Sequence, residues 1–403
     1  SRAGSAAGGV DSMKRDRPTR AGALGLRGFP VRPAVDAPSA SGRGLLATTL
    51  ILVGFGLLSV YSASSYVAQQ AGRPDTYYLF QQASRAGIGC LAMAAASILD
   101  YRVYRRLAWP ILAVTTILLI PLVLPGTQAI APTVNGARRW LNLGITLQPS
   151  ELTKLAVVIW TAALAVKKQD SLHDFREGIL PFLIVLAPIC LLVLLEPHFS
   201  AAMWIAVLAG TVLFAAGARL GHFALLGASV LVLAATQVLT ARYRLQRLTA
   251  FLDPETAAGA GGYQLKQSLI AIGSGGLTGV GFGRSTTKMQ FLPAPQNDFI
   301  FSIIAEEWGF VGVVAVIGLF AVWVHLGFRV ARSAPDLFGR LLATGITAGV
   351  ALAAFAHIGI ALGLLPTTGV NLPFISAGGT NLVITLGATG ILLNVSSARG
   401  RGR

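Results

Sequence analysis

Apolar segments long enough to cross a lipid bilayer recur along nearly the whole chain, and this feature constrains the fold more than any other. Hydrophobic residues make up 54% of the 403 residues and charged residues only 12%, which is about half the charged fraction of an average soluble domain. We therefore expect an all-α integral membrane protein with ten transmembrane helices. Their expected ranges are about 44–66, 84–99, 107–124, 150–166, 179–196, 199–217, 221–240, 299–327, 339–362 and 380–396.

The positions of the lysines and arginines predict how these helices are oriented. Basic residues in short loops favour the cytoplasmic side, and the segments 100–106 and 167–168 carry this signal most clearly. With a cytoplasmic N-terminus, most of the 32 Lys and Arg residues lie inside, and an even number of spans also places the C-terminus inside. The segments at about 125–149, 241–298 and 363–379 then face outward, and the second is a large extracytoplasmic loop between helices 7 and 8.

The two ends of the chain differ in composition from residues 44–396, which we interpret as a single polytopic membrane domain. Residues 1–43 are polar, basic and rich in Gly, Pro and Ala, so we expect a disordered cytoplasmic tail. They contain no apolar run before a cleavage site and do not resemble a signal peptide. Residues 1–12 read as a leader added during cloning, and residues 397–403 as a short basic cytoplasmic tail.

The net charge of +16 raises the question of nucleic-acid binding. The Lys and Arg residues are spread over inter-helix loops, where they act as topology signals, and do not gather in one motif. We therefore expect membrane lipid or an anionic lipid-linked substrate as the partner, and no nucleic acid. The two cysteines, Cys90 and Cys190, lie in different apolar spans and predict neither a disulfide nor a metal site.

Asp298 is the first candidate for chemistry, because it stands where a polar outer loop meets the eighth apolar span. A carboxylate at a membrane face is costly and is usually retained for function. Asp298 is predicted to act as a general base towards a hydroxyl group, or else to stabilise the helix start as a cap. Glu306 and Glu307 are alternative acids about 12 Å deeper along the same helix, at 1.5 Å per residue.

Glu151 and Lys154 form a second candidate group at the start of the fourth span. Three residues apart on a helix, they share a face. They are predicted either to line a polar cavity that holds substrate or to form an ion pair that locks two helices. Ser150 is the expected N-cap of this helix, although Pro149 before it leaves the exact start open.

Arg138, Arg139 and Trp140 lie in the outer segment just before this helix. The two guanidinium groups are predicted to bind a phosphate through paired donors, with simple solvation of an outer loop as the alternative. Trp140 fits a stacking platform for a sugar as well as an anchor at the membrane interface.

The long outer segment contributes Gln264, Gln267 and Lys288, together with a glycine-rich run at 272–284. Glycine permits positive φ and close backbone approach, so this group is predicted to cradle a pyrophosphate and sugars. A flexible linker is the alternative, since the run lacks the Gly-Lys-Ser/Thr of a nucleotide-binding loop.

The last outer segment contains Ser376 among prolines and glycines that imply non-helical backbone. Such backbone is tolerated at membrane depth only where protein or a wet cavity satisfies it. Ser376 is a candidate substrate ligand. His357, in the ninth span, is expected to form a hydrogen bond between helices, and His198 is ambiguous.

Seven groups of residues, spread in order over residues 44–396, together resemble the SEDS family (shape, elongation, division and sporulation). They are Asn135-Gly-Ala-Arg-Arg-Trp-Leu141, Gln148-Pro-Ser-Glu-Leu152 with Lys154, Gly262-Tyr-Gln264 with Gln267-Ser268, Ala271-Ile-Gly-Ser-Gly-Gly276, Phe291-Leu-Pro293, Asp298-Phe-Ile-Phe301 with Glu306-Glu307, and Leu365-Pro-Thr-Thr-Gly369 with Pro373-Phe-Ile-Ser376 and Gly378-Gly379.

The resemblance implies ten transmembrane helices and a peptidoglycan glycosyltransferase of the bacterial inner membrane. Its substrate would be lipid II, a disaccharide linked to undecaprenyl pyrophosphate, and Asp298 would occupy the family's essential catalytic position. A class B penicillin-binding protein would be the transpeptidase partner, with other divisome proteins. The resemblance implies no certain cofactor and leaves a divalent cation, Mg²⁺ or Mn²⁺, open.

Within the family, the segments 251–254 and 281–285 and Lys288 favour the branch that acts in cell division over the branch that acts in elongation. A flippase for the lipid-linked precursor and a scaffold that only recruits the transpeptidase remain as alternatives. The chain departs from the family pattern at Glu196-Pro197-His198, where Gln-Pro-Asp is usual, at Ser376-Ala-Gly-Gly-Thr-Asn381, and at His357.

Overall fold

The computed structural model describes residues 38–134, 136–142, 144, 146–224, 227–228, 251, 260–289, 292 and 295–398. All elements described belong to one compact unit, Arg32–Arg403. The predicted tails lie almost wholly outside the described residues, as do the predicted span 221–240, apart from its first few positions, and most of the segment 251–254.

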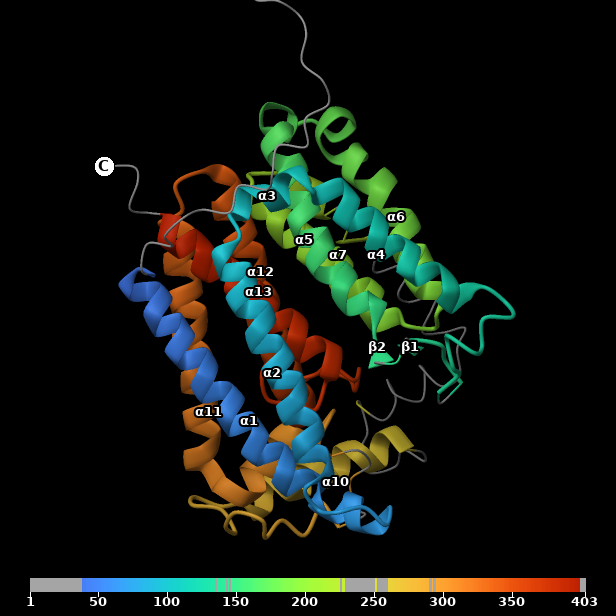
Figure 1. Ribbon diagram of the computed structural model, residues 1–403, viewed down its shortest axis with the longest axis vertical. Coiled ribbons are helices and arrows are strands. Elements are labelled where there is room, and N and C mark those ends of the chain that lie inside the picture. Colours follow the sequence, from blue (N-terminus) through green and yellow to red (C-terminus); the bar gives the residue numbers. More distant parts are fainter. Residues whose placement is uncertain are drawn as a thin grey trace, which may run out of the picture. The chain divides into compact units, whose positions relative to one another are not determined.

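The described part of the chain is a helical bundle with one two-stranded hairpin (Figure 1). The hairpin pairs β1 (Leu141–Asn142) with β2 (Thr146–Leu147) in antiparallel register. The helices are α1 (Ala40–Gln70), α2 (Tyr77–Ile98), α3 (Tyr101–Arg106), α4 (Ala108–Val123), α5 (Pro149–Lys167), α6 (Leu180–Leu195), α7 (Phe199–Ala215), α10 (Ala260–Ser274), α11 (Ile300–Arg332), α12 (Leu337–Ala361) and α13 (Gly379–Ser397).

Six helical segments of the described residues are long and apolar enough to cross a membrane. They are α1, α5, the Phe175–Leu195 segment that ends in α6, α11, α12 and α13, and α4 and α7 are shorter apolar helices. Each predicted span other than 221–240 overlaps one of the described helices. The exact count of ten and the position of the large loop stay predictions.

Local polar side chains cap the starts of several helices. Ser39 accepts a hydrogen bond from Gly42 N at 3.2 Å before α1, and Asp336 accepts one from Gly339 N at 2.8 Å before α12. At α5 the expected N-cap, Ser150, is wrong: the N-cap is Gln148, two residues earlier, and Pro149 is the first helical residue, because proline fits that position.

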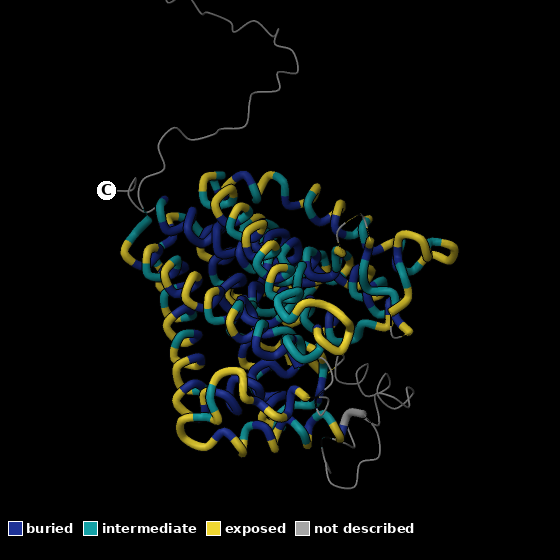
Figure 2. The backbone as a smooth tube through the Cα atoms, turned by 60° about the horizontal axis from the view of Figure 1, so that its bottom comes forward, coloured by how far each residue is buried: buried dark blue, intermediate teal, exposed yellow. Residues whose placement is uncertain are grey.

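The helices form two neighbouring groups that meet along α12 and α13 (Figure 1). α1 packs on α2 and α11, while α4, α5, α6 and α7 pack on one another, and α12 contacts α5, α7, α11 and α13. α13 packs along α2 for most of its length. Figure 2 shows the buried backbone through the middle of the bundle and the exposed stretches at its margins and turns.

The predicted outer segment 241–298 contains a helix, α10, that the sequence analysis described as loop. Leu265, Ser268 and Ala271, three residues apart, are buried on the face that packs against α11 and α12. The Ser268 hydroxyl lies 2.6 Å from Ser302 Oγ and 2.7 Å from the Ala361 carbonyl oxygen. Part of the buried face of α10 is therefore polar, so the sequence lacks the continuous apolar stripe that usually predicts a buried helix.

Helix α11 is broken at Gly309, whose φ of 63° and ψ of −161° are not helical. The glycine-rich run docks into this break and satisfies the backbone groups that the break exposes. The hydrogen bonds are Val280 N to Glu306 O, Gly281 N to Glu307 O, Phe310 N to Gly276 O and Val311 N to Leu277 O, at 2.9–3.2 Å.

This docking argues against the flexible linker, because backbone hydrogen bonds hold the run on α11. The predicted cradle for a pyrophosphate stays a prediction. A Cβ atom at Gly275 or Gly279 would collide with the carbonyl oxygens of Ala305 or Glu307. Gly275 and Gly279 are therefore used for close approach to the protein's own helix.

Candidate functional site

A cavity of about 130 Å³ lies between α5, α7, α12, α13 and the segment 369–373. Its lining is polar at one end and apolar at the other. The polar end holds Gln148, Glu151, Lys154, His198, Asn371 and Asn381. A mostly apolar cavity with a few converging polar groups is the usual form of a small-molecule site.

Glu151 and Lys154 meet at this polar end, as their spacing indicates. Lys154 Nζ lies 2.8 Å from Glu151 Oε1, and Asn381 donates from α13 to Glu151 Oε2 at 2.8 Å. Both oxygens of the acid therefore have partners. The ion pair lies within one helix and faces the cavity, so it is Asn381, rather than the pair, that links α5 to α13.

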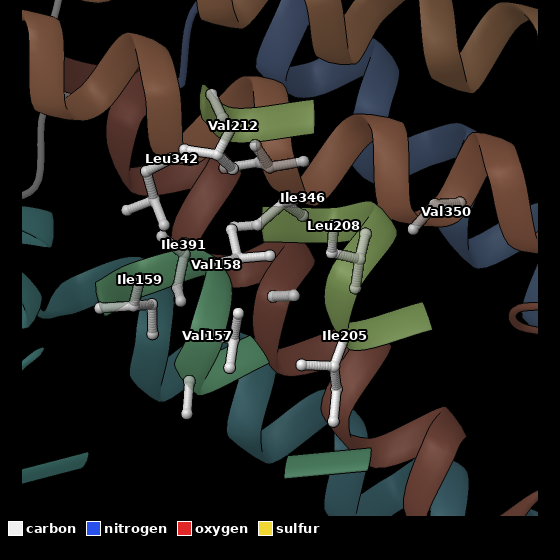
Figure 3. Close-up of a cluster of buried hydrophobic side chains, with 14 of the residues drawn as sticks. Val157, Val158, Ile159, Ile205, Leu208, Val212, Leu342, Ile346, Val350 and Ile391 are labelled. Carbon is white, nitrogen blue, oxygen red and sulfur yellow. The ribbon is translucent and has the colours of Figure 1, made fainter. Parts of the chain in front are cut away.

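The apolar end of the cavity is closed by packed aliphatic side chains, several of which Figure 3 shows. Val158, Leu208, Ile346 and Val350 line it. At Gly345 of α12, an added Cβ would lie only 2.6 Å from Val158 Cγ1 and 2.7 Å from Val212 Cγ2. The glycine lets α12 approach α5 and α7 so closely that the cavity ends there.

Asp298 lies in the turn before α11, one residue ahead of the N-cap Phe299, and is half-buried. Its carboxylate oxygens lie 3.6 and 3.8 Å from the position of a Cβ on Gly369. Gly369 in turn lines the cavity, together with Val370 and Asn371. Asp298 is not itself among the residues that line the cavity, but it stands beside the segment that forms one wall of it.

Ser376 holds this wall against the backbone next to Asp298. Its hydroxyl donates to Asn297 O at 2.8 Å and accepts from Leu372 N at 2.9 Å, and Ala377 N donates to Gln296 O at 2.9 Å. The side chain is buried. Its two backbone partners favour a role in positioning Asp298 over the predicted contact with substrate.

Lys288 was predicted to bind substrate, but in the structure its ammonium group has three protein partners. Nζ lies 3.0 Å from Glu307 Oε1, 3.1 Å from Ser62 Oγ and 2.7 Å from Gly283 O. An ammonium group has three protons to donate. Buried and fully bonded, Lys288 joins the loop to α1 and α11 and does not line the cavity.

Glu306 and Glu307, the alternative acids, are also bonded to this loop. Glu306 accepts from Ser285 Oγ at 2.5 Å and from both the amide and the hydroxyl of Thr286, at 2.9 and 3.0 Å. Glu307 accepts from Ser62 Oγ at 2.5 Å as well as from Lys288. Their oxygens hold the loop in place, which leaves Asp298 as the candidate base.

The two arginines of the first outer segment contact main-chain carbonyl groups. Arg138 Nη1 donates to Leu124 O at 2.9 Å, and Arg139 Nη2 donates to Pro197 O at 2.6 Å. Trp140 is half-buried. These three residues are not among those that line the cavity in the described part of the chain, and their predicted contact with phosphate or sugar stays a prediction.

Gln264 and Gln267 lie on α10, half-buried and outside the lining of the cavity. Their predicted contact with substrate likewise stays a prediction.

The turn between α6 and α7 carries the first departure from the family pattern, at Glu196 and His198. Burial raises the pKa of Glu196 to about 8, against the opposing charge of Arg139, and neither carboxylate oxygen has a hydrogen-bond partner among the described residues. Burial lowers the pKa of His198 to about 3, so the ring that lines the cavity is neutral. His198 Nδ1 lies 3.5 Å from Ser150 Oγ.

His357 bonds to the backbone of the cavity wall, not to another helix as expected. Its Nδ1 lies 2.6 Å from the Val370 carbonyl oxygen, and the side chain is buried. The third departure from the family pattern therefore also contacts a cavity-lining residue.

Sequence reasoning missed Gln148 and Asn371, and it noted Asn381 only as a departure from a motif. All three line the cavity. The signal that could have indicated them is a polar side chain near Pro or Gly in an outer segment. The sequence does not show which of these side chains come together at one cavity. It also passed over Arg85, a charged residue inside the second predicted span.

The fold and the cavity define a multi-helix membrane protein with one polar site near the end of its bundle. Comparison with known proteins identifies the class. The family model for cell cycle proteins of the FtsW, RodA and SpoVE type matches residues 43–400. The chain belongs to this family, which confirms the resemblance seen in the motifs and makes it a multi-pass membrane protein.

Curated relatives cover most of the chain. A probable peptidoglycan glycosyltransferase FtsW of Trichlorobacter lovleyi is 41% identical over 354 residues, 88% of this chain and 92% of the relative. Stage V sporulation protein E of Bacillus subtilis is 38% identical over 356 residues, 87% of this chain and 96% of the relative.

Solved structures share the fold. A chain from a peptidoglycan synthase complex that coordinates polymerisation and crosslinking matches with a TM-score of 0.74 and 28% identity, over 89% of this chain and 98% of its own. The rod shape determining protein RodA of Thermus thermophilus matches with a TM-score of 0.62 and 28% identity, over 89% and 97%.

Proposed function

We propose that this protein is a bacterial peptidoglycan glycosyltransferase that polymerises lipid II during septal cell-wall synthesis. The observation that carries the proposal is the position of Asp298, which faces Gly369 in the wall of the polar cavity. The name of the FtsW relative, a probable peptidoglycan glycosyltransferase, supports the activity. The segments 251–254 and 281–285 and Lys288 favour the division branch over the elongation branch. The protein acts in the inner membrane, with both termini cytoplasmic and the cavity on the extracytoplasmic side.

In the proposed reaction Asp298 accepts the proton of the sugar 4-hydroxyl of the acceptor. The hydroxyl oxygen forms a bond to the anomeric carbon of the donor as the bond from that carbon to the pyrophosphate breaks. Because attack comes from the face opposite the leaving group, the configuration inverts. Undecaprenyl pyrophosphate leaves as a stable anion, so the step needs no general acid.

Gln148, Glu151, Lys154, Asn371 and Asn381 hold the sugar in this proposal. The ion pair cancels the charges of Glu151 and Lys154 at 2.8 Å, and His198 is neutral. The lining thus offers hydrogen bonds without net charge, which suits the hydroxyl and amide groups of an amino sugar.

The same cavity weighs against the alternative of a flippase. A transport path must open to both faces in turn. Here the ionisable residues of the lining, Glu151, Lys154 and His198, gather at one end of the cavity, and the other end is lined by apolar side chains. A scaffold without activity would leave the polar lining without a use.

No step of the proposed reaction passes through a metal. Among the described residues, no group of three or more His, Cys, Asp or Glu side chains could hold an ion. A carboxylate such as Asp298 still suits Mg²⁺ or Mn²⁺ as one of several oxygen ligands, the others coming from substrate phosphates.

A class B penicillin-binding protein is the proposed partner, together with divisome proteins. The support is that a matching chain comes from a synthase complex that coordinates polymerisation with crosslinking. The partner would receive the glycan strands and crosslink them.

The test is polymerisation of lipid II by the purified chain with its transpeptidase, comparing wild type with Asp298→Asn. The substitution keeps the shape and removes the base, so the rate should fall by about 10²–10⁴-fold. Asp75→Asn is the matched control, because Asp75 is an acid in the turn after α1 that makes only a long contact, 3.4 Å, with Tyr61. Near wild-type polymerisation by Asp298→Asn would refute the mechanism, and inactive wild type would refute the function.

A further inference from the structure

Arg85 is a charged residue in the third turn of α2, about 12 Å from the start of the helix at 1.5 Å per residue. Ionisable side chains at such depth are costly and usually have a partner or a function. Among the described residues, the ion pairs are Arg102–Asp336, Lys154–Glu151 and Lys288–Glu307. No hydrogen bond or ion pair within that part of the chain engages the Arg85 guanidinium.

The guanidinium lies at the rim of the candidate site. Nε and Cζ are 2.7 and 2.8 Å from the position of a Cβ on Gly379, so the group rests on the backbone that starts α13. A Cβ atom on the neighbouring residue, Gly378, would lie 2.6 Å from Asn371 Nδ2, and Asn371 lines the cavity. Two glycines thus separate Arg85 from the polar end of the cavity.

Gln82, one turn earlier on the same face of α2, fixes this helix relative to Asp298. Its Nε2 donates to Ser376 O at 3.1 Å, and Ser376 Oγ donates to Asn297 O at 2.8 Å. The position of Arg85 is therefore set by the same contacts that position the candidate base.

We propose that Arg85 binds a phosphate group of the polyprenyl-linked substrate as it enters beside α2. The inference rests on the proposed function and adds the group that receives the anion. Arginine suits this use because its planar donors pair with phosphate oxygens and it stays charged at membrane depth.

This assignment divides the substrate between two regions. The neutral cavity takes the sugar, and the cation at its rim takes the phosphate to which the sugar is linked. Arg138, Arg139 and Lys288 were the cations predicted to hold the phosphate, and each is bonded to the protein itself. Arg85 is half-buried, so part of its surface is open to a ligand.

The test uses the full chain with its transpeptidase in lipid nanodiscs, and measures KM and kcat for lipid II. Loss of a charge-assisted hydrogen bond to phosphate should raise KM about tenfold in Arg85→Gln, with kcat within about twofold. Arg85→Lys keeps the charge but loses the paired donors, so its KM should lie between those of wild type and Arg85→Gln. Arg73→Gln is the matched control, because Arg73 lies in the same region but is exposed and rests on the ring of Tyr77, 4.3 Å from its centroid.

Gly379→Ala provides a second route that leaves the charge in place. Its Cβ would displace the guanidinium, so KM should rise here too. Each variant must also be shown to be folded, by a single peak in size-exclusion chromatography and an unchanged melting temperature. An effect on KM in both folded variants then cannot be attributed to misfolding of Arg85→Gln. Unchanged KM in both variants would overturn the proposal.

A bulk phospholipid headgroup carries the same phosphate chemistry and is the other source to exclude. In nanodiscs made only of phosphatidylcholine, the tenfold effect on KM should persist, whereas an effect present only with phosphatidylglycerol would overturn the proposal. Binding of undecaprenyl pyrophosphate, measured without turnover, should weaken about tenfold in Arg85→Gln. That difference would support the phosphate site even if wild type failed to polymerise lipid II, while equal binding would refute it.

Discussion

The side-chain nitrogen of Asn381 lies 2.8 Å from Oε2 of Glu151, whose other oxygen binds Lys154 at the same distance. One acid thus joins the first turn of α13 to the first turn of α5. Both helices start next to the segments that carry the polar lining of the cavity. The arrangement of the lining therefore depends on a contact between residues 230 positions apart in the sequence.

Asn381→Leu should weaken the protein and the site together. It removes a hydrogen bond to a charged acceptor, worth about 1.5–3 kcal/mol, and leaves Glu151 one donor short. We expect a lower melting temperature in detergent and a lower kcat/KM with lipid II. Asn381→Gln, which keeps the donor, should recover part of both, and a wild-type kcat/KM in Asn381→Leu would remove Asn381 from the site.

Lys288→Met should destabilise the protein far more than Lys154→Met. Lys288 and Glu307 are almost fully buried, and removal of one partner of such a pair costs about 3–5 kcal/mol because the remaining charge is left unpaired. The double variant Lys288→Met with Glu307→Gln should therefore be more stable than Lys288→Met alone. Thermal unfolding of wild type, the three single variants Lys154→Met, Lys288→Met and Glu307→Gln, and the double variant measures this. A double variant whose loss equals the sum of the losses in Lys288→Met and Glu307→Gln would contradict it.

Gly279→Ala should prevent the glycine-rich run from docking into α11. Its φ of 82° strains a residue with a side chain, and the new Cβ would also collide with the Glu307 carbonyl. Gly283→Ala is the matched control, since Gly283 has a φ of 77° but open space around it. Strain alone costs about 1–2 kcal/mol. Limited proteolysis of the loop should distinguish the two, and equal cleavage would argue against the docking.

Glu196→Gln should stabilise the protein at alkaline pH. The pKa of the Glu196 carboxyl is raised to about 8 by burial, so the unfolded chain loses its proton before the folded one does. Stability therefore falls as pH rises from about 4.5 towards 8. Glutamine cannot ionise, so its melting temperature should exceed that of wild type more at pH 8 than at pH 5. The same difference at both values would contradict the assigned titration.

Much of the fold follows from local sequence, because spans and helix faces are local properties. Apolar length placed α1, α5, α11, α12 and α13 to within a few residues, and the spacing of Glu151 and Lys154 placed them on one face. Helix α10 escaped notice because serines and short side chains bury it where apolar residues usually would.

The chemistry of individual polar residues was harder to foresee, because it depends on distant partners. From sequence alone, Lys288 is predicted to bind a substrate. In the structure it bonds to Ser62, which is 226 positions away in the sequence. Ser376 similarly meets Asn297, 79 positions earlier. A charge in a loop shows only that something must balance it, and the fold decides whether that partner is the ligand or the protein.

The break in α11 ties the order of assembly to the site. The glycine-rich segment has its hydrogen-bond partners on the freed edge of α11, which lies later in the sequence. During synthesis this segment must therefore wait, outside any final structure, until that helix has been inserted. Asp298 lies between the glycine-rich segment and α11 in the sequence. If synthesis stopped before α11 was inserted, the segment would lack its hydrogen-bond partners and Asp298 would not be held in its final position.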